Sequence, residues 1–175
     1  MALAVCLLFD PLTDRAIRQL WQRLEAHDGV STLASHTHGR HLPHLSYAVL
    51  REYDVESVRA AVAGLPDHGP LQLHVDAIGL FRRGRACLVP AVSGQLVARQ
   101  EAVVEAVLST GADLHRHYAP GAWVPHISIA TRVRQGALGP LTGAVHDILP
   151  LEASADHAAL VDSGTGERWP LPGVP

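Results

Sequence analysis

Two short stretches of the sequence repeat a pattern that is capable of acid–base chemistry. Residues 43–46 read Pro-His-Leu-Ser, and residues 125–128 read Pro-His-Ile-Ser. Each stretch opens an apolar run that is typical of a strand, and side chains along a strand alternate between its two faces. The histidine and the serine of each copy therefore share one face, and the aliphatic residue between them points the other way. Isolated surface histidines would not explain a duplicated pattern.

Four side chains from the two stretches suit the cleavage of a phosphodiester. The imidazole of His44 or His126 can take a proton from an attacking water or hydroxyl, and the other can give one to the leaving oxygen. The hydroxyls of Ser46 and Ser128 can donate hydrogen bonds to the non-bridging phosphate oxygens. These groups converge in one cleft if the two strands lie side by side. The sequence does not indicate which histidine is the base.

Arginines near the two stretches are weaker candidates for phosphate binding. Arg132 has the strand parity of the second histidine, and Arg40 has the parity of the first. A guanidinium can hold a phosphate through two parallel hydrogen bonds. Further arginines lie in an expected hairpin turn, where solvent exposure is the default and a role in holding a longer nucleotide tail is the alternative: Arg82, Arg83 and Arg85.

A cluster of histidines before the first stretch offers an alternative kind of site. His36, His38 and His41 are closely spaced, as zinc ligands often are. No cysteine accompanies them and their segment has the composition of a loop. We therefore expect no metal and no other cofactor, and we keep a metalloenzyme centred on these histidines as an alternative.

Composition limits the remaining function classes. The chain has 175 residues and a formal net charge of −3, which argues against an extended nucleic-acid groove. All 14 basic residues are arginine, so mechanisms that need a lysine are excluded. The longest apolar run, residues 2–9, is too short to cross a bilayer, and we expect a cytoplasmic protein with no membrane partner. Cys6 and Cys87 are expected to be buried free thiols.

Periodicity and turn residues predict the elements that must position these groups. Strands are expected over residues 2–9, 43–50, 71–81, 86–92, 125–133, 153–161 and 167–171. Helices are expected over residues 13–27, 55–65, 93–109 and 138–148. Strands and helices are mixed and hairpins are present, so the fold class is α+β with largely antiparallel sheets. No linker divides residues 1–175, which we expect to form a single domain.

The paired Pro-His-aliphatic-Ser stretches resemble the two-histidine (2H) phosphoesterase superfamily, which includes 2′,3′-cyclic phosphodiesterases and 2′-5′ RNA ligases. Residues 79–81 and 88–89 also resemble the central hairpin of that family. The resemblance implies two pseudo-symmetric lobes, each an antiparallel sheet with helices outside, around a central cleft. It implies that His44 and His126 are the catalytic histidines and that Ser46 and Ser128 take the hydroxyl positions of the site. Threonine is the commoner residue at those two positions in the family. It also implies a monomer.

The function expected from residues and resemblance together is that of a metal-independent phosphoesterase. It would cleave a 2′,3′-cyclic phosphate, or make and break 2′-5′ linkages, on nucleotides or RNA ends. A binding module that holds a phosphorylated ligand or RNA end in the same cleft without chemistry is the other alternative. The direction of the reaction and the product isomer are left open by the sequence.

Overall fold

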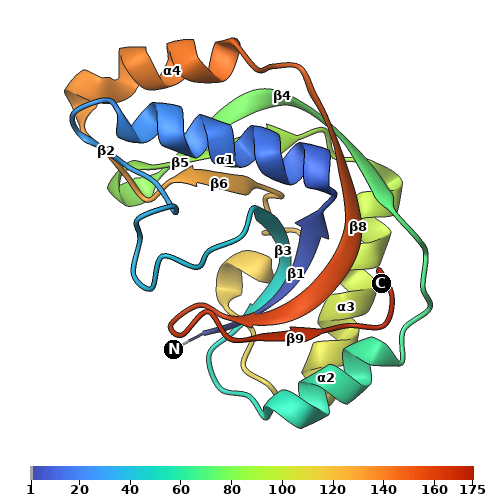
Figure 1. Ribbon diagram of the computed structural model, residues 1–175. Helices are drawn as coiled ribbons and strands as arrows, with labels where there is room; N and C mark the ends of the chain where they lie inside the picture. Colours follow the sequence, from blue (N-terminus) through green and yellow to red (C-terminus); the bar gives the residue numbers. More distant parts are fainter. Residues whose placement is uncertain (1) are drawn as a thin grey trace.

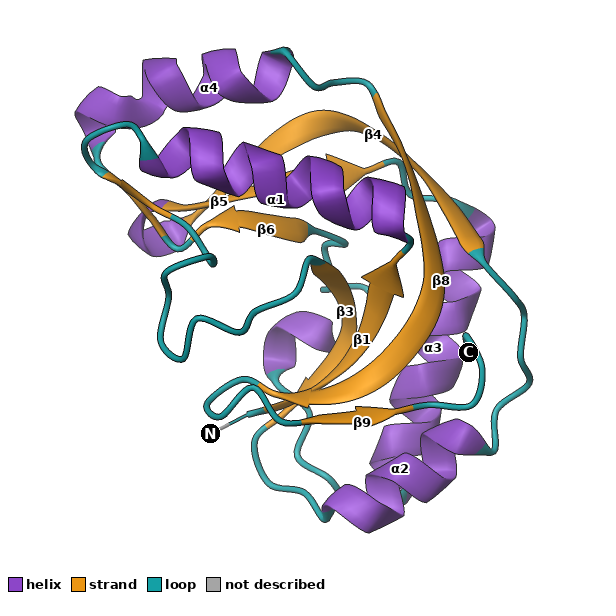
Figure 2. Ribbon diagram, in the orientation of Figure 1, coloured by secondary structure: helices purple, strands orange, loops and turns teal. Residues whose placement is uncertain are grey.

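The alternation of apolar and polar residues along the chain produces a mixed α+β architecture in the computed structural model, which describes residues 2–175 (Figures 1 and 2). The strands are β1 (Leu3–Phe9), β2 (Val30–Ser31), β3 (His44–Leu50), β4 (Leu71–Phe81), β5 (Arg85–Pro90), β6 (Ile127–Ala130), β7 (Arg132–Val133), β8 (Leu151–Asp162) and β9 (Arg168–Pro170). The helices are α1 (Pro11–Glu25), α2 (Val55–Ala63), α3 (Gly94–Ser109) and α4 (Leu138–His146). The expected α+β fold class is confirmed.

One antiparallel sheet forms two lobes. Its strand order is β1-β3-β6-β5-β4-β8-β9, and β8 additionally pairs with β1. The first part of β8, from Leu151 to Ala155, pairs with β4, and the part from Ala155 to Asp162 pairs with β1. The sheet therefore returns on itself, with β3 and β1 in one lobe and β6, β5 and β4 in the other.

The helices lie outside the sheet, and a helix can cover the lobe opposite to the one that contains the strand before it. Helix α1 follows β1 but lies with α4 over the lobe of β4, β5 and β6, whereas α2 and α3 cover the lobe of β1 and β3 (Figure 1). Asp10 caps α1 by accepting a hydrogen bond from the Thr13 amide, and Ser93 caps α3 in the same way. The apolar stripe of α1 is buried: Ile17, Leu20, Trp21 and Leu24.

The second motif strand is shorter than expected. A single strand was expected over residues 125–133, but β6 ends at Ala130, the chain bends at Thr131, and β7 pairs with β2 in a separate two-stranded sheet. Strand parity therefore does not carry through from β6 to Arg132.

The tip of the β4–β5 hairpin is a short 3₁₀ turn, Arg82–Gly84, packed against β7. Gly84 has a φ of +71°, in the left-handed region that favours glycine, and a Cβ there would lie 2.7 Å from the Val133 carbonyl oxygen. This close approach fixes the start of β5, where Arg85 lies.

Both cysteines are buried free thiols, as expected: Cys6 on β1 and Cys87 on β5. Within residues 2–175, no helix is both long and apolar enough to cross a membrane.

Candidate active site

The two motifs meet where the lobes join. β3 and β6 run antiparallel, with Leu45 directly paired to Ile127. Because an antiparallel register advances in opposite directions on the two strands, His44 is level with Ser128 and Ser46 is level with His126. One register thus gathers residues that are at least 80 positions apart, as the motif repeat predicts.

The alternation expected for each His-x-Ser stretch is present. The four apolar residues of the alternation are fully buried: Leu45, Tyr47, Ile127 and Ile129. His44, His126 and Ser128 are half-buried, whereas Ser46 is only 8% exposed. The polar face of the two strands is therefore partly shielded from solvent, with Ser128 lining one cavity and His44 lining another.

The two imidazoles are held in the same way. The Nδ1 of His44 donates to the Leu42 carbonyl at 2.7 Å, and the Nδ1 of His126 donates to the Val124 carbonyl at 2.8 Å. A carbonyl oxygen can only accept, so the proton of the neutral ring is on Nδ1. The Nε2 atom of each ring is left to exchange protons with a ligand.

Burial lowers the pKa of both histidines. For His44 the pKa falls mainly because burial disfavours the imidazolium. The hydrogen bond to the Leu42 carbonyl raises the pKa and partly opposes this decrease, whereas the charge of His126 lowers the pKa further. For His126 burial again dominates, the Val124 carbonyl opposes it, and the charge of Arg85 adds to the decrease. Both rings are therefore neutral in the free protein at neutral pH.

Two tryptophans fix the backbone of the motif serines. The indole Nε1 of Trp21, on α1, donates to the Ser128 carbonyl at 3.1 Å. The indole Nε1 of Trp123 donates to the Ser46 carbonyl, also at 3.1 Å. Each motif strand thus accepts a hydrogen bond from a tryptophan outside the sheet, and the accepting carbonyl is that of the motif serine in both cases.

The two cysteines also occupy equivalent positions. Cys6 pairs with Ser46 across β1 and β3, and Cys87 pairs with Ser128 across β5 and β6. The Cys6 Sγ and the Ser46 Oγ are 3.6 Å apart. Burial raises the pKa of Cys6 to about 12 and that of Cys87 to about 11, so both are neutral thiols and not nucleophiles.

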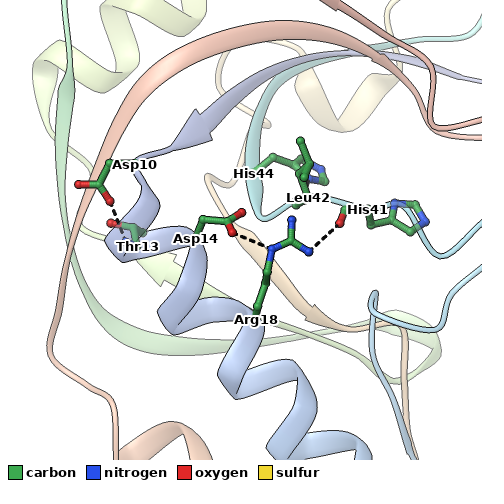
Figure 3. A network of polar contacts seen from close by, with 7 residues as sticks. All are labelled: Asp10, Thr13, Asp14, Arg18, His41, Leu42 and His44. Carbon is green, nitrogen blue, oxygen red and sulfur yellow. Dashed lines mark hydrogen bonds and ion pairs between the residues drawn. The ribbon is translucent and has the colours of Figure 1, made fainter.

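Figure 3 shows how α1 holds the segment that leads into β3. Arg18 forms an ion pair with Asp14 at 2.7 Å, and its Nη1 donates to the His41 carbonyl at 3.4 Å. Leu42, next in the chain, carries the carbonyl that orients the His44 ring. The orientation of one motif histidine therefore depends on a contact from the helix of the opposite lobe.

Arg85, for which the sequence offers solvent exposure in a turn as the default and contact with a nucleotide tail as the alternative, lies beside the second motif. It lines a cavity of about 190 Å³ together with Ser128, and its charge lowers the pKa of His126. The pairing of Cys87 with Ser128 puts the start of β5 beside the second motif, a tertiary relation that a single sequence does not carry.

Two aromatic residues, Tyr118 and Phe81, also border the site. Burial raises the pKa of Tyr118 to about 12, Cys6 adds to the increase, and Ser46 and Arg85 oppose it, so this hydroxyl lies among site residues. The Phe81 ring meets the His126 ring edge-on, with centroids 5.0 Å apart.

The two arginines proposed from parity are placed differently. The Arg40 Nη2 donates to the Thr165 carbonyl at 2.8 Å, and Arg40 lines a second small cavity together with His44. Arg132 is exposed on β7 opposite Ser31, and among residues 2–175 it lines neither of these two cavities. Arg40 thus shares a cavity with the first motif histidine, whereas Arg132 shares neither of the two cavities with a motif residue.

The histidine cluster packs ring against ring. The centroids of His38 and His41 are 4.2 Å apart, and those of His36 and His41 are 5.7 Å apart. Thr37 Oγ1 lies 2.9 Å from the His41 Nε2. In the described residues, no group of three or more His, Cys, Asp or Glu side chains could hold a metal ion.

A two-lobed antiparallel fold with a His-x-Ser stretch on each of two central strands defines the class of two-histidine phosphoesterases. The family model described as "2'-5' RNA ligase superfamily" matches residues 12–167, and the chain belongs to that superfamily. Among curated proteins, none matches the chain significantly.

Solved structures share the fold over nearly the whole chain. TT0787 of Thermus thermophilus has a TM-score of 0.62 at 16% identity and covers 99% of each chain. E. coli LigT in its apo form has a TM-score of 0.59 at 14% identity, covering 97% of this chain and 94% of LigT. Kluyveromyces marxianus Usb1 has a TM-score of 0.56 at 15% identity, covering 98% of this chain and 97% of Usb1. The expected two-lobed 2H phosphoesterase fold is thereby confirmed.

Proposed function

We propose that this phosphoesterase hydrolyses a 2′,3′-cyclic phosphate, or makes and breaks 2′-5′ linkages, at a nucleotide or RNA end. The single observation that carries the proposal is the pairing of Leu45 with Ile127, which brings two imidazoles and two hydroxyls together at the junction of the lobes. All four side chains come from one chain, so the reaction needs no second copy. We propose that residues 1–175 act as one two-lobed monomeric domain.

In hydrolysis, the Nε2 of one neutral histidine takes a proton from a water molecule as the water oxygen forms a bond to phosphorus. The bond from phosphorus to one ribose oxygen breaks, and the other histidine, protonated, donates its proton to that oxygen. A phosphomonoester and a free ribose hydroxyl result. Ser46 and Ser128 hold the non-bridging oxygens, so that phosphorus lies between the two rings. The reverse reaction exchanges the roles of the two histidines.

An anionic substrate supplies the protonation state that the free protein lacks. Both histidines have lowered pKa values, so the base form is ready and the acid form is scarce. A bound phosphate raises the pKa of nearby imidazoles, because an opposite charge favours the protonated ring. Substrate binding thus brings a proton to the general acid.

Solved complexes of proteins with this fold support a nucleotide substrate. One structure holds E. coli LigT with 3′-AMP, and another holds Kluyveromyces marxianus Usb1 with uridine monophosphate. The preference for a small cyclic phosphate rests on the net charge of −3, because a chain without a strongly basic surface suits a small substrate or a short RNA end.

The test is turnover of 2′,3′-cyclic nucleotides and 2′-5′ dinucleotides by the wild type and by His44→Ala and His126→Ala, with and without EDTA. Each variant is expected to lose kcat by about 10²- to 10⁴-fold, as for removal of a general acid or base. His27→Ala, at an exposed histidine after α1, is the matched control and keeps activity. Full activity in either motif variant rejects the mechanism. Binding without turnover identifies a binding module instead, and sensitivity to EDTA favours a metalloenzyme.

A further inference from the structure

The cavity beside the second motif has features that the two-histidine chemistry does not use. Its volume is about 190 Å³, several times the ~30 Å³ that one water occupies in the liquid, so a phosphate group fits. Its lining comes from three segments: Leu33, His36, Arg85, Ser128, Ala130 and Thr131. No carboxylate is among these residues, and two of them can carry positive charge.

Arg85 has hydrogen-bond donors to spare for a ligand. Within residues 2–175 its guanidinium is in no ion pair, in contrast to Arg18 and Arg51. The Thr131 hydroxyl already donates to the Ser31 carbonyl at 3.1 Å, so it adds shape rather than a donor. The donors left for a second phosphate are therefore those of Arg85 and the His36 ring, because the single hydrogen of the Ser128 hydroxyl is assigned to the reacting phosphate.

The structure holds Arg85 in place through its neighbours. It follows Gly84, whose α-carbon packs against the Val133 backbone at the hairpin tip. Two residues later, Cys87 pairs with Ser128. Arg85 is thus tied at both sides to the segment that carries the second motif, although its side chain is exposed.

We propose that this cavity is a subsite for a second phosphate of the substrate, bound mainly by Arg85 next to the reacting phosphate at Ser128. The proposal rests on the proposed function for the identity of the reacting group. A guanidinium on a held backbone position, with no carboxylate lining the cavity, matches a phosphate through paired hydrogen bonds. The subsite selects a nucleotide that carries a phosphate beyond the one that reacts, either a terminal 5′-phosphate or the next phosphodiester of an RNA end.

Calorimetric titration separates this subsite from catalysis, because it needs no turnover. The probes are a nucleoside 3′-phosphate, the matching 3′,5′-bisphosphate, and a dinucleotide that ends in a 3′-phosphate. The wild type is expected to bind the bisphosphate or the dinucleotide at least about tenfold tighter than the monophosphate, as a charge-assisted contact provides. The ligand that gains more distinguishes a terminal phosphate from an RNA backbone.

Arg85→Gln is expected to abolish the preference for the bisphosphate or the dinucleotide over the monophosphate, and Arg85→Lys is expected to retain part of it. Arg82→Ala, the matched variant in the same hairpin, is expected to keep the full preference. Equal affinities in the wild type, or a preference that survives in Arg85→Gln, overturn the subsite. Circular dichroism confirms that the variants are folded. Lack of turnover of every cyclic or 2′-5′ substrate, with the tenfold preference intact, would reject the proposed reaction while supporting the subsite.

Discussion

His44 of β3 is level with Ser128 of β6, since Leu45 pairs with Ile127 between them. The same register puts Ser46 level with His126, so an approximate twofold axis runs between the two strands. Each half of the site therefore combines a histidine from one lobe with a serine from the other. The proposed chemistry therefore requires both lobes to be in register, and the predictions below test how the surrounding structure maintains this arrangement.

The rate should depend on pH with an optimum on the acidic side. The fraction of the protein that has one motif histidine neutral and the other protonated is greatest between their two pKa values. Both pKa values lie below the ordinary histidine value of 6.5. The value of kcat/KM is therefore expected to peak below pH 6.5 and to fall as the pH rises through neutrality. A pH series of initial rates at low substrate concentration measures this. An optimum well above pH 7 would contradict the lowered pKa values.

Trp21→Phe should reduce both stability and activity. The change removes the indole donor to the Ser128 carbonyl and leaves that carbonyl without its partner. We expect a loss of about 1–2 kcal/mol in the free energy of unfolding, and a fall in kcat because β6 loses a positioning contact. Urea denaturation and steady-state kinetics measure the two effects.

Trp123→Phe is the symmetry-related test, through the Ser46 carbonyl. Trp169→Phe is the control, because within residues 2–175 the indole of Trp169 makes no hydrogen bond, although the ring packs against the core. An equal fall in kcat for the control would mean that the hydrogen bonds do not position the site.

Gly84→Ala should destabilise the hairpin tip. A left-handed φ costs a non-glycine residue about 1–2 kcal/mol, and the new Cβ would be 2.7 Å from the Val133 carbonyl oxygen. Gly111→Ala is the matched control, since Gly111 has a φ of +80° with nothing within 4 Å of a Cβ. Thermal unfolding is expected to show a clearly larger loss for Gly84→Ala. Equal losses would mean that the contact with β7 contributes nothing.

His41 should make the protein less stable in acid. Burial, followed by the charges of His38, His44 and His36, lowers its pKa to about 4 from the ordinary 6.5. The unfolded chain therefore binds the proton more readily, and stability present above pH 6.5 is lost as the pH falls toward about 4.

Denaturation at about pH 7 and about pH 5 tests this linkage. His41→Asn is expected to lose less stability between the two pH values than the wild type. His27→Asn, at an exposed position, is the control and should behave as the wild type does. An unchanged pH dependence in His41→Asn would contradict the assignment.

The features carried by local periodicity were predicted well from the sequence. The stripe of Ile17, Leu20, Trp21 and Leu24 predicted α1, and the alternation from Leu71 predicted β4 to its last residue. The resemblance predicted the two-lobed fold. Hydrophobic periodicity and a short motif can both be read from a few neighbouring residues, without knowing which segments pair in the fold.

The errors arose where position depends on tertiary pairing. Arg132 follows a bend at Thr131 that nothing in the surrounding residues marks, so a parity count across it fails. Arg85 borders the second motif because β5 pairs with β6, a tertiary relation that no local pattern shows, so the sequence could not decide between its two expected roles. The catalytic assignment of the two histidines and two serines stays a prediction, which the variants above test.

The long strand β8 belongs to both lobes, with Ala155 paired to Leu71 of one and Phe9 of the other. Although the motifs repeat, the molecule cannot be divided into two self-sufficient copies: a fragment that lacks residues 151–162 would expose unpaired edges on both β1 and β4.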